Sequence, residues 1–455
     1  MRVLLVSTYE LGRQPVHLAV PAAALRARGH EVRTVDLAVD DWDPAVVDDV
    51  DALAVSVTMH TAARLANDVA ASTKARRPAL PRLAYGLYAG QTTGFDATIA
   101  GEYLPTLIGW VGGEPVTDPA PLVRTATPVP DRSGLPPVDR YAHLLVDGET
   151  RLAGAVEASR GCASRCRHCP VPVVYDGRTR IVDPDVVLAD VDALVAAGAR
   201  HITFGDPDFL NAVHHSMRVA RGLHARHPDV TFDITTKVEL ILRHRGLWDE
   251  LAALGCLFTV TALECVDDEV LAILDKGHTA AQAAEAVAVV RAAGIDVRPS
   301  LLPFTPWTTL EGLVALIDFV AIHDLAANVE PVHWTIRLLV PTGSLLLDRP
   351  ELAPHLAGYD PAQLGHRWIA ADPRVDELHA RLVPLVEGLV AEEASPVTVF
   401  RAVAAEVRNA AGLDPALGVL DEGSCRPRLS EAWFCCAEPT DAQLGRVSLL
   451  PPVRR

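Results

Sequence analysis

The sequence predicts an α/β protein in which a Rossmann-like parallel sheet is followed by a partial (β/α)6 barrel and a small helical C-terminal region. Three observations support this fold class. Apolar runs of strand length alternate with segments of helical period on both sides of a proline-rich stretch. Glycines stand where the helices should stop, at Gly29, Gly198, Gly255 and Gly294. Six strand-then-helix units follow Ala153, which is the number that a partial barrel needs.

Residues 1–115 form the first predicted domain. Strands are expected at residues 2–7, 31–35, 53–57 and 83–86, with helices ending at Gly29 and spanning residues 61–75. Residues 116–150 are expected to be a linker, because prolines break a hydrogen-bonded ladder and stiffen the chain. The prolines of this segment are Pro119, Pro121, Pro128, Pro130, Pro136 and Pro137.

Residues 151–350 form the predicted barrel. Its expected strands are residues 154–158, 201–204, 231–235, 257–262, 296–302 and 333–339. In parallel barrels the chemistry gathers at the C-terminal ends of the strands. Residues 351–455 are predicted to be helical, with amphipathic helices over residues 375–392 and 397–411 and a polar tail at the end.

The composition excludes several classes of protein. The 455 residues include 41 basic and 58 acidic side chains, a formal net charge of -17, so we expect no nucleic-acid partner. No stretch approaches the roughly 20 apolar residues of a membrane span, and no signal peptide precedes the first strand. We therefore expect a cytoplasmic protein without a membrane partner. The eight cysteines, several of them clustered, indicate metal or redox chemistry rather than a disulfide framework.

Three cysteines share one short loop directly after the first barrel strand. Cys162, Cys166 and Cys169 are soft sulfur ligands that suit zinc or an iron–sulfur cluster. A structural zinc site needs a fourth ligand, which His168 would have to provide from a position between two of the cysteines. An iron–sulfur cluster held by three cysteines instead leaves one iron open for substrate.

The Cys-x-x-x-Cys-x-x-Cys spacing resembles the signature of radical S-adenosylmethionine (SAM) enzymes. The resemblance implies that Cys162, Cys166 and Cys169 hold a [4Fe-4S] cluster whose fourth iron chelates SAM. Reductive cleavage of SAM then yields a 5'-deoxyadenosyl radical, and an external one-electron donor of the flavodoxin or ferredoxin type supplies the electron. The resemblance covers Ala153 to about Ser344.

Further positions follow from the same resemblance. Gly205 and Asp206 stand where the family contacts the SAM ammonium group, with Asp208 as second choice and an Asp-Pro turn as the structural alternative. Residues 261–265 and 270–279 resemble the Gly-Leu-Glu-Ser and Leu-x4-Lys-x2-Thr patterns of the cobalamin-type branch, which places Glu264 against SAM. His168 replaces an aromatic residue beside adenine, and Arg298 either holds a carboxylate or faces solvent.

The N-terminal domain resembles the cobalamin-binding domain that precedes the barrel in many of these proteins. The Asp-x-His-x-x-Gly element that supplies a cobalt ligand is absent, and Tyr85-Gly-Leu-Tyr-Ala-Gly90 replaces the usual Gly-Gly. The two expectations are bound cobalamin or a scaffold that has lost it.

The C-terminal string Cys435-Cys-Ala-Glu-Pro439 is similar to the tail of a radical SAM group named for a CCAEP or, with selenocysteine, CUAEP sequence. Cys435 and Cys436 are candidate catalytic thiols that would ligate a metal, capture an electrophile or quench a radical, and Cys425 is a possible third ligand. The alternative is a pair of buried, inert cysteines. We expect the tail to fold over the barrel mouth.

The leading hypothesis is a radical SAM enzyme acting on a small-molecule or peptide substrate, with cobalamin-assisted methylation as one form of the reaction. Methylthiotransfer to transfer RNA is disfavoured, because the first 161 residues contain no cysteine and the charge is acidic. The alternative from another class is an iron–sulfur or zinc protein without turnover, an electron carrier or a sensor.

Overall fold

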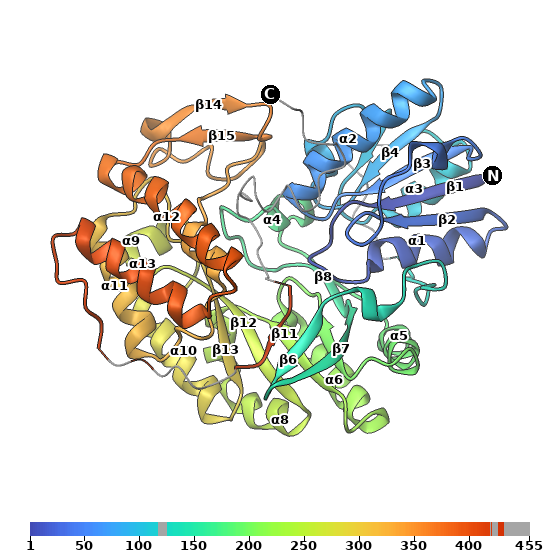
Figure 1. Cartoon of the computed structure of the whole chain (residues 1–455). Helices are drawn as coiled ribbons and strands as arrows, with labels where there is room; N and C mark the ends of the chain where they lie inside the picture. The colour runs from blue at the N-terminus through green and yellow to red at the C-terminus, as the bar shows by residue number, and fades with distance from the viewer. Residues whose placement is uncertain (117–124, 419, 421–425, 432–455) are drawn as a thin grey trace.

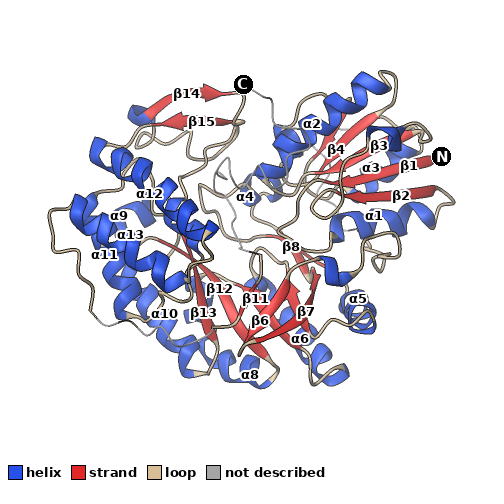
Figure 2. Ribbon diagram, in the orientation of Figure 1, coloured by secondary structure: helices blue, strands red, loops and turns tan. Residues whose placement is uncertain are grey.

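The computed structural model describes residues 1–116, 125–418, 420 and 426–431. An N-terminal sheet domain lies beside a curled sheet wrapped by helices, and two long C-terminal helices pack on the far side of that sheet (Figure 1). Strands occupy the interior of both domains and helices cover them (Figure 2). This layering confirms the predicted fold class.

The N-terminal domain contains a five-stranded parallel sheet of order β2-β1-β3-β4-β5. β1 is buried along nearly its whole length, as expected for a parallel strand covered on both faces. α1 and α3 build one apolar core with the sheet, and α2 with η1 builds the other. The strands are β1 (Arg2–Ser7), β2 (Glu31–Asp36), β3 (Ala52–Ser56), β4 (Arg82–Tyr85) and β5 (Ala97–Ile99), and the helices are α1 (Val16–Arg26), η1 (Pro44–Val47), α2 (His60–Arg76), η2 (Ala89–Gln91) and α3 (Leu104–Val111).

The second domain contains a seven-stranded sheet of order β13-β12-β11-β10-β7-β6-β16. β7, β10, β11, β12 and β13 are parallel, and β6 and β16 add antiparallel strands at one edge. The strands are β6 (His143–Val146), β7 (Glu149–Val156), β10 (His201–Phe204), β11 (Thr231–Thr235), β12 (Cys256–Glu264), β13 (Asp296–Leu301) and β16 (Arg428–Leu429). The covering helices are α5 (Pro184–Ala196), α6 (Val213–Arg226), α7 (Val238–Arg243), α8 (Trp248–Ala253), α9 (Asp268–Ile273), α10 (Ala280–Ala292) and α11 (Leu310–Ile322).

The prediction of a sixth barrel strand over residues 333–339 is wrong. Its place is taken by the 3-10 helix η6 (Pro331–Thr335) and one parallel bridge between Phe304 and Arg337. The Leu301 N–H, at the end of β13, donates to His333 Nδ1 at 2.8 Å. The His333 side chain therefore accepts the hydrogen bond that a backbone carbonyl of a sixth strand would have accepted.

The C-terminal region confirms both expected helices as α12 (Pro373–Ala391) and α13 (Pro396–Ala410). Asp372 and Ser395 cap their N-termini, and a proline occupies the first turn of each. The region also contains the hairpin of β14 (Leu356–Asp360) and β15 (Gly365–Trp368), which the sequence did not indicate. η7 (Ala353–His355) precedes this hairpin.

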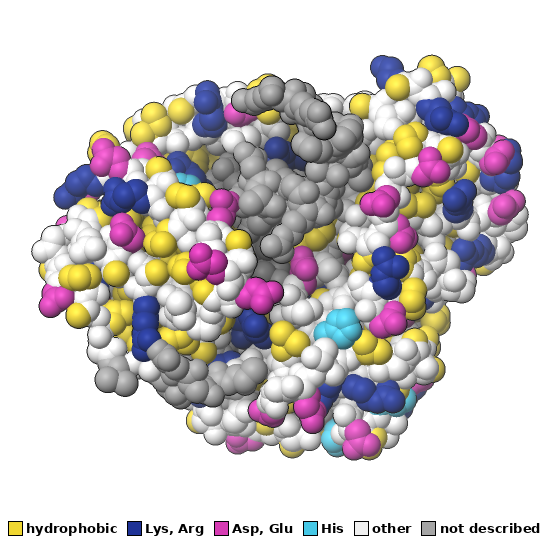
Figure 3. Space-filling view, viewed as in Figure 1, with side chains coloured by type: hydrophobic (Ala, Val, Ile, Leu, Met, Phe, Trp, Pro, Cys, Tyr) yellow, Lys and Arg dark blue, Asp and Glu magenta, His cyan; other side chains and the backbone are white. Residues whose placement is uncertain are grey.

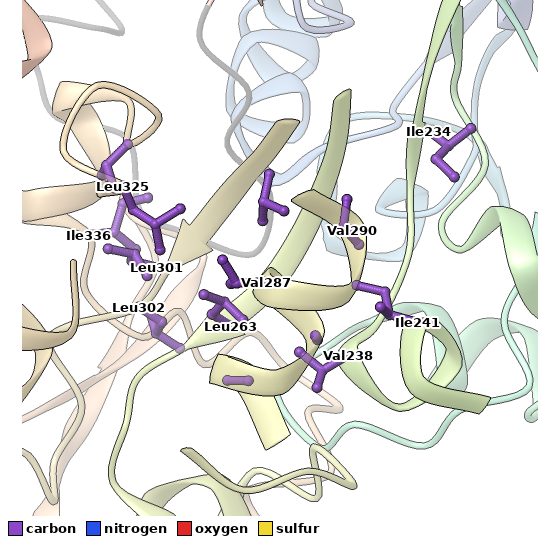
Figure 4. Close-up of a cluster of buried hydrophobic side chains, with 14 of the residues drawn as sticks. Ile234, Val238, Ile241, Leu263, Val287, Val290, Leu301, Leu302, Leu325 and Ile336 are labelled. Carbon is purple, nitrogen blue, oxygen red and sulfur yellow. The ribbon is translucent and has the colours of Figure 1, made fainter. Parts of the chain in front are cut away.

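The largest core lies between the curled sheet and its outer helices. Figure 4 shows Val287 and Val290 of α10 together with Leu263 of β12 and Leu301 of β13.

The predicted tail cysteines Cys425, Cys435 and Cys436 lie outside the described residues. The residue limits of the four predicted segments stay a prediction.

No helix in the described part of the chain is long and apolar enough to cross a membrane. Basic and acidic side chains are interspersed over the face shown in Figure 3.

Candidate active site

The cysteine loop leaves the barrel mouth through the short strand β8 (Ser159–Gly161) and ends at α4 (Val171–Tyr175). β8 pairs with β9 (Thr179–Ile181). Gly161 has φ +74, and a Cβ there would lie 2.2 Å from the Arg178 carbonyl oxygen, so no other residue fits.

Arg167 anchors this loop to the end of α9. Its backbone N–H donates to Leu274 O at 2.9 Å, and its guanidinium donates to Ala272 O and Ile273 O. Cys162 and Cys166 are buried, and Cys169 is partly exposed. Contacts of Arg167 therefore hold the loop against the end of α9.

The sulfur of Cys162 accepts two hydrogen bonds, from Asn211 Nδ2 at 3.1 Å and from the Ser164 N–H at 3.4 Å. Burial raises the pKa of the Cys162 thiol. Cys162, Cys166, Cys256 and Cys265 form no disulfide with another residue that the structure describes. Donors aimed at a sulfur stabilise a thiolate, so the donor set fits an iron–sulfur cluster.

His168, Glu264 and Lys276 form a buried group beside this loop. Glu264 Oε1 accepts from Lys276 Nζ at 2.9 Å and lies 3.2 Å from His168 Nε2. Burial alone would raise the pKa of Glu264, but Lys276 and His168 hold it well below its usual range. Burial alone would lower the pKa of Lys276, but Glu264 and Cys166 raise it well above its usual range. The carboxylate and the ammonium are therefore both charged.

Glu264 stands at the end of β12 with φ +64, where the pairing with β13 shifts register. A bulge of this kind bends the strand and re-aims a side chain. A non-glycine residue in the left-handed region is strained, and such strain is concentrated at functional sites. The fold therefore directs Glu264 toward His168 and the cysteine loop.

Asp206 uses both carboxylate oxygens within the protein. Oδ2 accepts from the Ala158 N–H at 2.9 Å, and Oδ1 accepts from Ser159 Oγ at 2.5 Å. Burial raises the pKa of Asp206 to about 7. Asp208 caps the following 3-10 helix η4 (Phe209–Ala212) and accepts from Thr236 Oγ1. Contact of Asp206 with SAM remains a prediction.

Arg298 lies inside the barrel and is buried, so the expectation of a solvent-facing arginine is wrong. It pairs with Glu330 and donates to the Pro427 carbonyl at 3.2 Å. Pro427 directly precedes β16, so Arg298 holds the returning chain against the barrel.

A cavity of about 180 Å³ lies between the two domains. Its walls come from the loops that follow β1, β3, β4 and β5, and from the barrel mouth around Glu157, Gly161 and Gly205. The C-terminal ends of strands from two parallel sheets thus face each other, which is where open α/β folds bind ligands.

His17 spans this cavity wall between two acids. Its Nδ1 lies 2.7 Å from Glu10 Oε1, and its Nε2 lies 3.3 Å from Glu157 Oε1. Burial alone would lower the pKa of His17, but Glu157 and Glu10 raise it to about 9. The imidazole is therefore protonated at neutral pH and links the domains as a cation.

Sequence reasoning did not assign roles to Arg13, His17 or Asn211. Each is brought to the site by a loop or helix far away in sequence, and none belongs to a recognisable spacing. Lys276 lay within a matched pattern, but its ion pair with Glu264 needed the fold.

Residues 156–320 match the family model of the Radical SAM superfamily. The match covers the loop that carries the three cysteines and identifies residues 156–320 as a radical SAM domain. A [4Fe-4S] cluster and SAM are the cofactors of this domain.

Among curated proteins, the chain is similar to the hopanoid C-3 methylase of Methylococcus capsulatus strain Bath, with 22% identity over 325 residues. The alignment covers 65% of this chain and spans 62% of that methylase. The hopanoid C-2 methylase of Rhodopseudomonas palustris strain TIE-1 is 27% identical over 70 residues, 15% of this chain and 13% of that protein.

Among solved structures, the fold is similar to the cobalamin-dependent SAM radical enzyme OxsB with aqua-cobalamin bound. The TM-score is 0.67 with 16% identity, covering 86% of this chain and 67% of OxsB. The radical SAM methyltransferase TsrM from Kitasatospora setae, with cobalamin and a [4Fe-4S] cluster bound, gives a TM-score of 0.62 with 17% identity. That likeness covers 93% of this chain and 92% of TsrM.

Proposed function

We propose that this radical SAM enzyme also binds cobalamin and transfers a methyl group to a small-molecule or peptide substrate. The observation that carries the proposal is the cavity between the carboxyl edge of the N-terminal sheet and the barrel mouth. Two further findings support it: the methylase relatives, and the likeness to structures described with cobalamin bound.

The hydrogen bonds that the Cys162 sulfur accepts support a cluster at this loop, and the buried charged group beside the loop supports a SAM site. Cys162, Cys166 and Cys169 would hold the cluster, and the buried group of His168, Glu264 and Lys276 would orient SAM beside it. When bound, these groups supply one-electron cleavage of a sulfonium and, with cobalamin, a carrier for the methyl group. The protein excludes water by burying the charged group and pinning the loop through Arg167.

The fit to cobalamin requires movement. The cavity of about 180 Å³ is smaller than the roughly 300 Å³ at which cofactor pockets usually begin. The loop of residues 8–15, between β1 and α1, borders it, so we expect this loop to move on binding. His17 on the described wall has both ring nitrogens engaged by acids, so it is not free to serve as a cobalt ligand.

The partner and the tail complete the proposal. An external one-electron donor of the flavodoxin or ferredoxin type would reduce the cluster. We propose that Cys435 or Cys436 acts on the substrate as a catalytic thiol; both cysteines lie outside the described residues.

The first test measures SAM cleavage. Protein with a reconstituted cluster is incubated anaerobically with SAM and dithionite, and 5'-deoxyadenosine and S-adenosylhomocysteine are quantified by mass spectrometry. We expect product from the wild type and from the control Cys256→Ala, which removes a buried cysteine away from the loop. Cys166→Ala should abolish it. Equal traces from all three proteins would refute the catalytic part of the proposal.

The second test measures cobalamin binding by the absorbance of protein-bound hydroxocobalamin after gel filtration. Leu87→Trp fills the interdomain cavity and should prevent binding, whereas Ile322→Trp, at a side chain 78% exposed, should not. Protein that retains a single zinc ion, no sulfide and no cobalamin would instead support the non-catalytic alternative.

A further inference from the structure

One arginine of the N-terminal domain stands where two cavities meet. Arg13 lines the interdomain cavity and also a second, smaller cavity inside the barrel. The barrel cavity is lined by strand residues such as Asp233, Val260 and Arg298, and by Glu431 of the returning chain. Arg13 therefore faces the space between the cofactor side and the barrel interior.

The Arg13 guanidinium makes no hydrogen bond and no ion pair to any other residue that the structure describes. Its Nε is buried without a partner. A guanidinium offers five N–H donors, and enclosing it without an acceptor is costly. Burial accordingly lowers the pKa of Arg13.

None of the nearest acids makes a hydrogen bond to the Arg13 guanidinium, although Glu10 Oε2 is itself buried without a partner. Glu10 and Glu157 flank the protonated His17. Asp233 Oδ1 accepts from Thr203 Oγ1 at 2.6 Å and lies 2.9 Å from His201 Nε2. These acids influence Arg13 through space but give its donors no acceptor.

The backbone is shaped to present this side chain. Leu11 and Gly12 both have positive φ, +53 and +62, immediately before Arg13. A Cβ on Gly205, directly after β10, would lie 3.4 Å from Arg13 Nη1, which is an ordinary contact distance, so the guanidinium lies close over the end of this strand. Backbone strain is concentrated at functional sites, so positive φ values directly before an unpaired cation indicate that the cation contacts a ligand.

We propose that Arg13 binds a carboxylate group of the ligand that fills the junction of the two cavities. A planar guanidinium with free donors matches a carboxylate in a two-pronged contact. The inference rests on the proposed function, because the junction is then the substrate channel. The carboxylate belongs either to the substrate or to SAM itself.

The test uses anaerobic, cluster-containing protein without SAM, and sodium acetate as the carboxylate probe. Melting temperatures are compared in acetate and in chloride at equal ionic strength. We expect acetate to raise the midpoint of the wild type by a few degrees, because a ligand of the folded state stabilises it. Arg13→Met should lose this response and, in chloride, should be no less stable than the wild type.

Arg28→Met is the matched control, because Arg28 lies on the surface and its side chain donates only to the Ala24 carbonyl among described residues. It should keep the wild-type acetate response. Arg13→Gln is a second variant with the same expected loss of the acetate response. An equal acetate response in wild type and both Arg13 variants would overturn the inference, as would a marked loss of stability in chloride.

Equilibrium dialysis with SAM then distinguishes the two sources. A tenfold or greater loss of SAM affinity in Arg13→Met assigns the carboxylate to SAM, and unchanged affinity assigns it to the substrate. Failure of the proposed function shows separately, as absence of 5'-deoxyadenosine from wild-type protein that still gives the acetate shift.

Discussion

At the scale of single residues, the site depends on charges that the fold has removed from water. Glu264 and Lys276 have side chains 8% and 3% exposed and lie 2.9 Å apart. Such a pair is stable only while both partners remain, because removing one leaves a buried charge without compensation. The pair therefore ties the stability of the barrel mouth to the identity of both residues.

We predict that Lys276→Met lowers the free energy of unfolding by about 3 kcal/mol, because the buried Glu264 carboxylate loses its ammonium partner and keeps only the His168 imidazole beside it. Urea unfolding of the anaerobic protein measures this. Lys74→Met, at an exposed lysine of α2, is the control and should change stability by less than about 0.5 kcal/mol. A Lys276 variant as stable as this control would show that the pair contributes little.

We expect the stability of the protein to depend on pH through Asp36, at the end of β2. It accepts from Tyr141 Oη at 2.8 Å, and burial raises its pKa to about 7. The unfolded chain binds that proton only below about pH 4, so the folded state holds the extra proton between these values. Stability should therefore fall as pH rises from about 4 to 7, by up to roughly 1.4 kcal/mol per unit.

Asp36→Asn should remove this slope and be more stable than the wild type at about pH 8. Thermal unfolding across the pH range measures it, and Asp40→Asn, at an exposed aspartate of the next turn, is the control. Parallel profiles for wild type and Asp36→Asn would contradict the assignment.

At the scale of elements, local signals decide where helices begin, and cross-strand partners decide which strands form. The Leu-x4-Lys-x2-Thr pattern, which resembles the cobalamin-type branch, ends in an exposed helix cap: Thr279 Oγ1 accepts from the Gln282 N–H at 3.3 Å, and Gln282 Oε1 accepts from the Thr279 N–H at 2.9 Å. This reciprocal capping box begins α10. The threonine thus has a structural reason to be there.

Thr279→Ala should destabilise the protein by about 1 kcal/mol, because the first turn of α10 loses its cap. Thr279→Ser keeps the hydroxyl and should be close to wild type. Chemical unfolding compares the three proteins, and SAM affinity is measured in parallel. A large loss of SAM affinity with unchanged stability would indicate a direct contact instead.

At the scale of the whole molecule, Arg132 of the connecting segment joins both domains. It forms a two-pronged pair with Asp190 of α5 at 2.7 and 2.8 Å, and it donates to Gln14 Oε1 of the N-terminal domain. Its Nη2 also donates to the Ala155 carbonyl of β7. The relative placement of the two domains, and so of the cavity between them, depends on this residue.

We predict that Arg132→Met lowers the free energy of unfolding by about 3 kcal/mol. The Asp190 side chain is only 3% exposed, so its carboxylate would be left buried without its partner. Calorimetry should also show the single transition splitting as the domains uncouple. Arg226→Met is the control. It breaks an exposed ion pair with Asp192, which lies on α5 like Asp190, and it should lower the free energy of unfolding by less than about 1 kcal/mol. A single, unshifted transition for Arg132→Met would count against coupling of the domains through this residue.

The sequence by itself determined the layered α/β architecture, the two parallel sheets and the cysteine loop. Apolar periodicity and glycine stops are local signals, and three cysteines within eight residues need no folding to be neighbours. It could not determine that residues 333–339 form no regular strand among the described residues, because that depends on His333 accepting from the Leu301 N–H across the sheet. Nor could it show that Arg298 is buried and paired with Glu330.

Only the tertiary structure decided which charges meet. Three charged side chains have their partners or surroundings far away in the sequence. They are Glu264 with Lys276, His17 between two acids, and Arg13 at the cavity junction. The physical reason is that the energy of a buried charge is set by partners brought together through packing. No periodicity or spacing in the chain records those partners.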